Sequence, residues 1–269
     1  MQSMKPSLGR QESQMLAYLQ MRRQRLVRTG ELTGPLRLSL LQERELFRRM
    51  ARGKLIARVR PGLYLVPDRL PLGGAWTPSE ALALDAVLVD RKGSYQICGP
   101  NAFNRYGFDG QVPTRVYAYN NRISGTRVVG AVALMLIKVA DKRLGDTETV
   151  TGSDGVAARW SSRARTLVDA VYDWSRFGSL PRAFRWIETE LASKRVSTAE
   201  LVRVTLRYGD VATTRRMGAL LDELGAPAAA VNRLARAVPE TRGSIAFNPG
   251  RPKRGTLNRR WGVVMNALD

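Results

Sequence analysis

The sequence predicts an α+β protein in which a basic N-terminal region, built from helices and a short hairpin, precedes a larger mixed region. Residues 39–66 have the pattern of an amphipathic helix followed by a β-hairpin. Residues 94–138 alternate β-prone runs with Gly-rich turns, and from residue 162 onward apolar residues recur at helical spacing. We therefore expect a small sheet first and a run of helices at the C-terminal end.

The helix predicted over residues 39–52 carries a core-facing stripe. On a helical wheel, one arc holds Leu40, Leu46, Phe47, Met50 and Ala51. Ser39 suits the N-cap, because its hydroxyl can accept from a free amide of the first turn. Gly53 is predicted to end the helix in the left-handed conformation.

The hairpin predicted over residues 55–66 turns at Pro61 and Gly62. Arg58 and Arg60 stand two residues apart on its first strand, so we expect both side chains on one face. Upstream, residues 12–23 and 29–36 predict two further helices. Three helices and a hairpin wing within residues 1–70 are the pattern of a winged helix-turn-helix, whose recognition helix enters the major groove of DNA.

The charge balance favours a polyanionic partner. The chain carries 44 Lys and Arg against 23 Asp and Glu, a net charge of +21, and residues 1–70 hold 15 against 5. Such an excess concentrates nucleic acid at the surface and makes its binding depend on salt. The alternative is that the arginines of residues 39–52 form only a solvated helix face.

Neither a membrane nor an oxidising compartment is indicated. The longest apolar run, residues 128–139, is too short to cross a bilayer, and the first residues lack the apolar centre of a secretory signal. Cys98 is the only cysteine, so no intrachain disulfide can form. We expect a cytoplasmic protein without a membrane partner.

A Pro/Gly-rich connector at residues 67–74 predicts the domain boundary, with a DNA-binding domain over 1–70 and an α+β domain over 71–269. Thr77 is predicted to cap the helix that follows, with Glu80 completing a capping box. The further predicted strands are 94–98, 114–119, 127–138 and 261–265, and the further helices 162–173, 180–193, 198–208 and 211–224.

Missing residue types argue against an enzyme. The chain has no histidine, which removes the commonest general base and metal ligand. It also lacks phosphate-binding GxxxxGK[ST] and GxGxxG loops. We therefore expect no catalytic residue, metal or cofactor. An RNA- or DNA-processing enzyme that uses Asp and Glu with Mg²⁺ stays open as an alternative.

The carboxylates that such an enzyme would need fit ordinary structural roles. Asp141, Asp146 and Glu148 are spread along a polar loop, where solvated side chains are expected. Asp169 and Asp173 lie on one predicted helix, at spacings that favour ion pairs with Arg165 and Arg176.

Five segments together resemble the AbiEi-type antitoxins. They are RMARGKLIARVRPGLYLVP from residue 49, YQICGPNAFNRYGF from 95, SSRARTLVDAVYDW from 161, YGDVATTRRMGALLDELGAP from 208 and RRWGVVMN from 259. The resemblance lies in these segments and in the order in which they follow one another along the chain. The resemblance covers the chain from about Gln11 to Asn266.

This resemblance implies the antitoxin of a two-gene abortive-infection toxin–antitoxin system for phage defence. Its N-terminal domain would bind operator DNA, at inverted repeats, and repress its own operon. The second domain would counteract a nucleotidyltransferase-type toxin, directly or through the toxin's RNA target. The alternative is a winged-helix transcriptional regulator whose second domain binds an effector or dimerises, with no toxin partner.

The predicted DNA site has two parts. Near the start of the recognition helix, four side chains are expected to approach base edges: Ser39, Gln42, Arg44 and Glu45. Contacts with DNA phosphates are expected from Arg48, Arg49 and Arg52 of the helix and from Arg58 and Arg60 of the wing.

A second basic surface is predicted from Arg215, Arg216, Arg251, Lys253 and Arg254. The alternatives are that Arg215 and Arg216 pack their helix against its neighbours, and that the basic residues of 241–260 only solvate a loop. Three tyrosines, Tyr106, Tyr117 and Tyr119, fit either an interface or the core.

Overall fold

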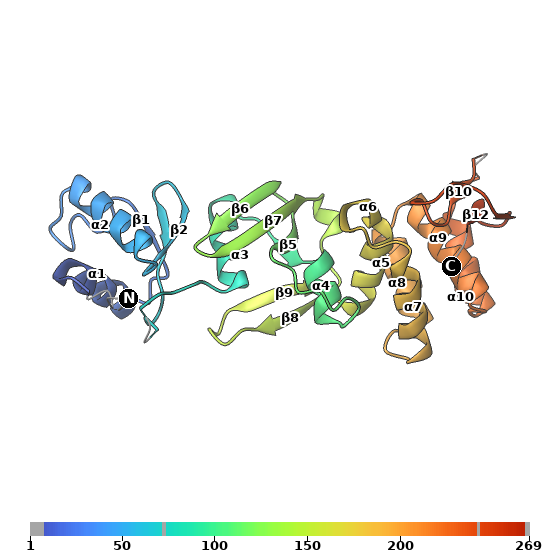
Figure 1. Cartoon of the computed structure of the whole chain (residues 1–269), viewed down its shortest axis with the longest axis horizontal. Coiled ribbons are helices and arrows are strands. Elements are labelled where there is room, and N and C mark those ends of the chain that lie inside the picture. The colour runs from blue at the N-terminus through green and yellow to red at the C-terminus, as the bar shows by residue number, and fades with distance from the viewer. Residues whose placement is uncertain (1–7, 72–73, 241–242, 267–269) are drawn as a thin grey trace, which may run out of the picture. The chain divides into compact units, whose positions relative to one another are not determined.

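A computed structural model describes residues 8–71, 74–240 and 243–266, and it is a mixed α+β protein (Figure 1). The chain divides into two compact units. Unit 1 comprises the described residues of Met1–Tyr95, Thr114–Lys138 and Val150–Ala158; unit 2 those of Gln96–Pro113, Val139–Thr149 and Arg159–Asp269. The boundary predicted after residue 70 falls inside unit 1. Residues 72–73 of the connector and 241–242 of the basic segment lie outside the described residues.

Unit 1 begins with two helices and a three-stranded sheet (Figure 1). The elements are α1 (Arg10–Met21), β1 (Leu26–Arg28), α2 (Leu40–Arg52), β2 (Ala57–Arg60) and β3 (Leu63–Leu65). The antiparallel sheet has the order β1-β3-β2. Two predicted helices and the hairpin with its turn at Gly62 are thus confirmed. The helix predicted over 29–36 is wrong, because turns occupy residues 29–37.

The ends of α2 differ from the prediction in two places. Leu46, Phe47 and Met50 are fully buried as expected, but Leu40 is 44% exposed, since it lies in the first turn at the margin of the buried arc. Gly53 has φ −72° and does not take the left-handed conformation. Lys54 takes it, at φ 58°, and the Leu55 amide then donates to the Met50 carbonyl at 2.9 Å. The left-handed residue therefore comes one position later than predicted.

The turn segment 29–37 is held to α2 by the carboxylate of Glu43. This side chain is fully buried, and its two oxygens accept the backbone N–H groups of Gly30, at 2.5 Å, and of Leu32, at 2.8 Å. A buried carboxylate is stable only when hydrogen bonds replace its water shell. Glu43 therefore fixes the turn against the helix where a second short helix had been expected.

The rest of unit 1 contains a helix and three strands of a larger sheet. Helix α3 (Glu80–Leu88) starts at an N-cap that is Ser79, whose hydroxyl accepts from the Leu82 amide. The capping box predicted for Thr77 and Glu80 is therefore wrong. Strands β5 (Val116–Asn120) and β6 (Gly125–Val129) both pair with β7 (Val132–Lys138), the first parallel and the second antiparallel. The full sheet also contains β4 (Tyr95–Ile97), β8 (Thr147–Thr151) and β9 (Ala157–Ser161), in the order β6-β7-β5-β4-β9-β8.

Unit 2 is mainly helical, and from residue 163 onward its helices include those predicted (Figure 1). Its helices are α4 (Gly99–Arg105), α5 (Arg163–Tyr172), α6 (Trp174–Phe177), α7 (Arg182–Ala192), α8 (Thr198–Tyr208), α9 (Val211–Glu223) and α10 (Ala228–Ala237). Strands β4 (Tyr95–Ile97), β8 (Thr147–Thr151) and β9 (Ala157–Ser161) contribute residues to it. Helix α5 lies at its centre, with every residue from Ala164 to Val171 buried. It packs against α4, α7, α8 and α9.

The C-terminal sheet is attached to α9 by buried arginines. It contains β10 (Ile245–Ala246), β12 (Val263–Met265) and β11 (Thr256–Asn258), in that order. Arg215 donates to the carbonyls of Trp261, at 2.6 Å, Gly243, at 2.8 Å, and Gly262. Arg216 donates to the Ala246 carbonyl at 3.1 Å.

A glycine of α9 completes this attachment. The Trp261 ring lies so close to the helix that a Cβ on Gly218 would be 2.2 Å from it. The indole N–H of Trp261 donates to Asp222 one turn further along, at 2.5 Å. The C-terminal sheet is thus joined to α9 by polar contacts and by a buried ring.

We predict that Glu43→Gln destabilises the start of unit 1. The amide NH₂ would face a backbone N–H, so one buried donor loses its acceptor, at a cost of about 2 kcal/mol. Hydrogen exchange at Gly30 and Leu32 should accelerate by a factor of about 30. The control is Glu45→Gln on the exposed face of the same helix, which should leave both rates unchanged. Equal exchange rates in the two variants would contradict the role of Glu43 in holding the turn segment against α2.

We also predict that Arg215→Ala lowers the free energy of unfolding by about 3 kcal/mol, because three backbone carbonyls lose their donor. Arg254→Ala removes the same charge from an exposed loop and should change stability by less than about 0.5 kcal/mol. Urea titration of both full-length variants measures the difference. If both substitutions lower the free energy of unfolding by similar amounts, the contacts of Arg215 with the C-terminal sheet do not stabilise the protein.

Candidate nucleic-acid interface

A groove of about 600 Å³ runs between α2 and the β2–β3 hairpin of unit 1. It is lined by Thr29, Arg44, Arg48, Ala51, Arg52, Arg58, Pro61, Gly62 and Tyr64. Two internal contacts set its width. The Tyr64 ring stacks on Phe47 of α2, with centroids 4.7 Å apart, and the Thr29 amide donates to the Gly62 carbonyl at 3.0 Å. Helix, turn segment and hairpin are therefore fixed to one another.

Four arginines give the groove its chemistry. Arg44, Arg48 and Arg52 follow one another at four-residue intervals on α2, so they share a face, and Arg58 comes from the hairpin opposite. Arg48 pairs with Glu45 at 2.9 Å. Over the described residues, the side chains of Arg44, Arg52 and Arg58 have no hydrogen-bond or ion-pair partner. Exposed guanidinium groups of this kind bind phosphate oxygens and guanine edges.

All nine residues predicted for the DNA site are exposed, but two of them are engaged at the start of α2. The Ser39 hydroxyl accepts from the Gln42 amide at 3.2 Å, and the Gln42 side-chain oxygen accepts from the Ser39 amide at 2.8 Å. This capping box confirms Ser39 as the N-cap. Their side chains stabilise the helix end, so their use in base contacts stays a prediction.

Two further predicted phosphate ligands, besides Arg48, are in ion pairs. Arg49 pairs with Glu12 of α1 at 2.9 Å. Arg60 pairs with Asp90, which also accepts from Arg28 at 2.5 Å. The hydrogen bond from Arg60, reinforced by the charges of Arg28 and Arg60, holds the pKa of Asp90 below its usual value.

The expectation that Arg58 and Arg60 share a face is wrong. Arg58 is opposite Tyr64 and Arg60 is opposite Leu63, so Val59 is the extra residue of a β-bulge. The bulge breaks the two-residue alternation of the strand. Arg58 lines the groove as a result, whereas Arg60 does not.

Three residues of this region were not predicted from the sequence. Thr29 and Tyr64 line the groove, and Leu41 stands 70% exposed on α2. Leu41 could have been found, because it precedes Arg44, Arg48 and Arg52 at the spacing of one helix face. Thr29 had no such signal, since its position depends on a turn that was predicted as a helix.

The second predicted basic surface is not one surface. Arg215 and Arg216 are only 4% and 7% exposed and bind backbone carbonyls, which corrects their assignment as surface groups. Burial lowers the pKa of both guanidinium groups. Arg251, Lys253 and Arg254 are exposed on the loop between β10 and β11, where the Lys253 amine donates to the Ser244 carbonyl.

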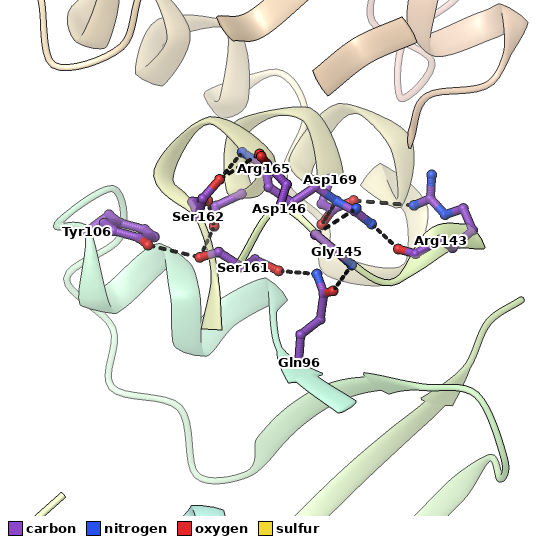
Figure 2. Close-up of polar contacts among 10 residues, drawn as sticks. Gln96, Tyr106, Arg143, Gly145, Asp146, Ser161, Ser162, Arg165 and Asp169 are labelled. Carbon is purple, nitrogen blue, oxygen red and sulfur yellow. Dashed lines mark hydrogen bonds and ion pairs between the residues drawn. The ribbon is translucent and has the colours of Figure 1, made fainter. Parts of the chain in front are cut away.

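Unit 2 also holds a buried polar cluster, drawn in Figure 2. Arg165 and Asp169 are both fully buried and pair at 2.8 Å, as the helical spacing predicted. Arg165 also donates to the Arg143 carbonyl at 2.8 Å, and its guanidinium lies 3.9 Å from the Tyr208 ring centroid. The Arg143 side chain reaches the other oxygen of Asp169 at 3.3 Å. Burial raises the pKa of Asp169, against the opposing charges of both arginines.

The same cluster continues through Ser161, Ser162 and Asp146 (Figure 2). The Ser162 hydroxyl donates to Asp146 at 2.8 Å, and Arg203 pairs with the other oxygen of Asp146. Gln96 bridges the Ser161 hydroxyl and the Gly145 amide, both at 2.8 Å. These bonds join the loop around Gly145 to the start of α5, which is a scaffolding role.

The three predicted tyrosines divide between core and partly exposed positions. Tyr119 is fully buried, while Tyr106 and Tyr117 are half-buried. Burial, with the nearby charge of Glu148, raises the pKa of Tyr106 to about 12. Its phenol therefore keeps its proton at neutral pH and donates it to the Ser161 carbonyl at 2.9 Å.

The remaining carboxylates do not gather into a metal site. Among the described residues, no group of three or more His, Cys, Asp or Glu side chains could hold a metal ion. Asp173 pairs with Arg176 at 3.7 Å, so the second predicted helical pair is confirmed too. No helix within the described ranges has the length and apolar character needed to span a membrane.

Comparisons with known proteins bear on the fold alone. No protein-family model matches the chain, and no curated protein does. Among solved structures, the chain is similar to the crystal structure of the RV2827C protein from Mycobacterium tuberculosis, with a TM-score of 0.60 at 17% sequence identity. The match covers 96% of this chain and 92% of that chain. The likeness therefore extends over the whole mixed α+β architecture.

Proposed function

We propose that this chain binds double-stranded DNA through α2 and the β2–β3 hairpin, and that it represses its own operon as the antitoxin of a two-gene system. The observation that carries the DNA-binding part is the groove of unit 1, where Arg44, Arg52 and Arg58 meet without an acidic partner among the described residues. Unpaired cations that converge from two elements fit a chain of phosphates.

The order of elements supports this proposal. A helix, a strand, a second helix and an antiparallel hairpin follow one another from α1 to β3. In a winged helix-turn-helix, the helix before the hairpin lies in the major groove and the hairpin contacts the adjacent backbone. In this assignment the turn segment 29–37, held by Glu43, replaces the middle helix.

The size of α2 fits binding in the major groove of DNA. Helix α2 has 13 residues. At about 1.5 Å per residue, such a helix is roughly 20 Å long. A major groove about 12 Å wide admits it, with its N-terminal turns closest to the bases. Arg44 and Glu45 would then approach base edges, while Arg48, Arg52 and Arg58 would hold phosphates on either side.

The antitoxin role rests on the resemblance to AbiEi-type antitoxins. It assigns operator binding to the basic N-terminal region and opposition to a nucleotidyltransferase-type toxin to the rest of the chain. The ion pairs of unit 2 fit a structural rather than a catalytic role for its carboxylates, because Asp146 and Asp169 are each held by arginines. We accordingly propose no enzymatic activity, and a cytoplasmic setting in which the chain meets both its operator and its toxin.

We predict that Arg52→Ala and Arg58→Ala each weaken binding to the DNA upstream of the gene and flatten its salt dependence. One lost phosphate contact should lower the slope of log K against log[salt] by about 0.9. Fluorescence anisotropy between about 50 and 200 mM salt measures this slope.

The matched control is Arg236→Ala on α10, which removes one exposed charge from a helix of unit 2. It should leave the slope within error of the parent chain. If all three variants lose the same slope, the net charge alone attracts DNA and the groove is not the site.

We further predict that DNA binding and toxin opposition can be separated. A full-length Arg44→Ala, Arg52→Ala, Arg58→Ala triple variant should lose repression of its promoter but still rescue growth when the toxin gene beside it is expressed. Reporter expression and colony counts give the two readouts. Loss of rescue by this variant, with its fold intact, would place toxin opposition in the same region. The absence of any toxic neighbouring gene would favour the plain transcriptional regulator.

A further inference from the structure

Leu41 is the most exposed leucine of the described residues, at 70%, and it lies in the first turn of α2 beside Leu40, at 44%. A large apolar side chain in water forgoes the free energy of burial, about 1.5 to 3 kcal/mol for a leucine. Isolated exposed leucines occur on most proteins. Leu41 differs because of the side chains that surround it.

Leu41 stands in the arginine row of α2. Residues 41, 44, 48 and 52 are separated by three, four and four positions, which places them along one helix face. Arg44, Arg48 and Arg52 line the groove, so Leu41 is the apolar N-terminal end of the same basic row. A ligand that lies along this row would meet cations over most of its length and one apolar contact at the end.

The polar side chains at this end of the helix have other partners. Ser39 and Gln42 bond each other in the capping box, and Glu43 is buried beneath the helix. Among residues 39–43, the two leucines are therefore the side chains left to face a ligand.

Double-stranded DNA offers one apolar group in its major groove, the C5-methyl of thymine. We propose that Leu41 contacts thymine methyl groups and gives this protein a preference for A·T pairs beneath the start of α2. The inference rests on the proposed function and extends it from DNA binding to sequence choice. Arg44, one turn away, would contribute the neighbouring hydrogen-bonded contact.

A second copy of the chain is the competing occupant of Leu41. Two leucine side chains supply little of the roughly 1,200 Å² that a stable protein interface buries. If a second copy docked here by the same face, Arg44, Arg48 and Arg52 of the two copies would lie against one another, and like charges repel. Charge complementarity therefore favours DNA.

The test compares upstream DNA with the same DNA in which uracil replaces thymine, a change that removes only the methyl group. The parent chain should bind the uracil duplex about fourfold more weakly for each methyl contacted by Leu41. Leu41→Ala should bind both duplexes equally, at the affinity of the parent chain for the uracil duplex. Leu257→Ala, which truncates a 46% exposed leucine in β11 of unit 2, should retain the discrimination of the parent chain.

Four results would overturn the inference. Equal binding of both duplexes by the parent chain, with the upstream preference intact, removes the methyl contact and leaves the proposed function standing. A uracil effect of equal size in the parent chain and in Leu41→Ala assigns it to DNA shape. A change of oligomeric state in Leu41→Ala, measured by sedimentation, assigns Leu41 to a second copy. Failure to prefer upstream DNA over shuffled DNA removes the proposed function itself, and the inference with it.

Discussion

The candidate interface depends on one buried carboxylate. Glu43 is on the helix that carries the arginine row, yet its side chain points inward and binds the amides of Gly30 and Leu32. The same turn segment, through Thr29, bonds the tip of the hairpin at Gly62. Helix and hairpin are thereby linked through a segment without regular structure. The arginines face one another across the groove because this connection holds both walls in place.

Unit 2 also depends on buried charged groups, but there arginines make most of the long-range polar contacts. There buried arginines bind backbone carbonyls and carboxylates, and one of those carboxylates, Asp169, is itself fully buried. Arg165 joins Asp169 to the loop around Gly145, and Arg215 joins α9 to the C-terminal sheet. Arginine suits such positions because its planar group presents several donors in fixed directions. A basic residue in this chain can therefore be part of the scaffold as readily as part of a binding surface.

The sequence predicted most of the regular elements and few of the long-range polar contacts. Helices such as 198–208 follow from apolar spacing and caps, both of which are local. The pairing of Arg165 with Asp169 was equally local, at one helical turn. The burial of Arg215 was not, because it depends on carbonyls of residues 243, 261 and 262, far along the chain. The bulge at Val59 was likewise invisible, since nothing in the residue pattern interrupts the alternation.

The net charge of +21 therefore overstates the surface available to a polyanion. A protein cation that binds a DNA phosphate releases a counterion condensed on the DNA. An arginine already paired with a carboxylate contributes less to this release. Arg49 and Arg60 are paired with Glu12 and Asp90, while Arg215 is buried. Among the described residues, Arg44, Arg52 and Arg58 have no carboxylate partner, and all three line one groove. The position of these three residues, more than the charge of the whole chain, is what supports the proposal that DNA binds along α2 and the hairpin.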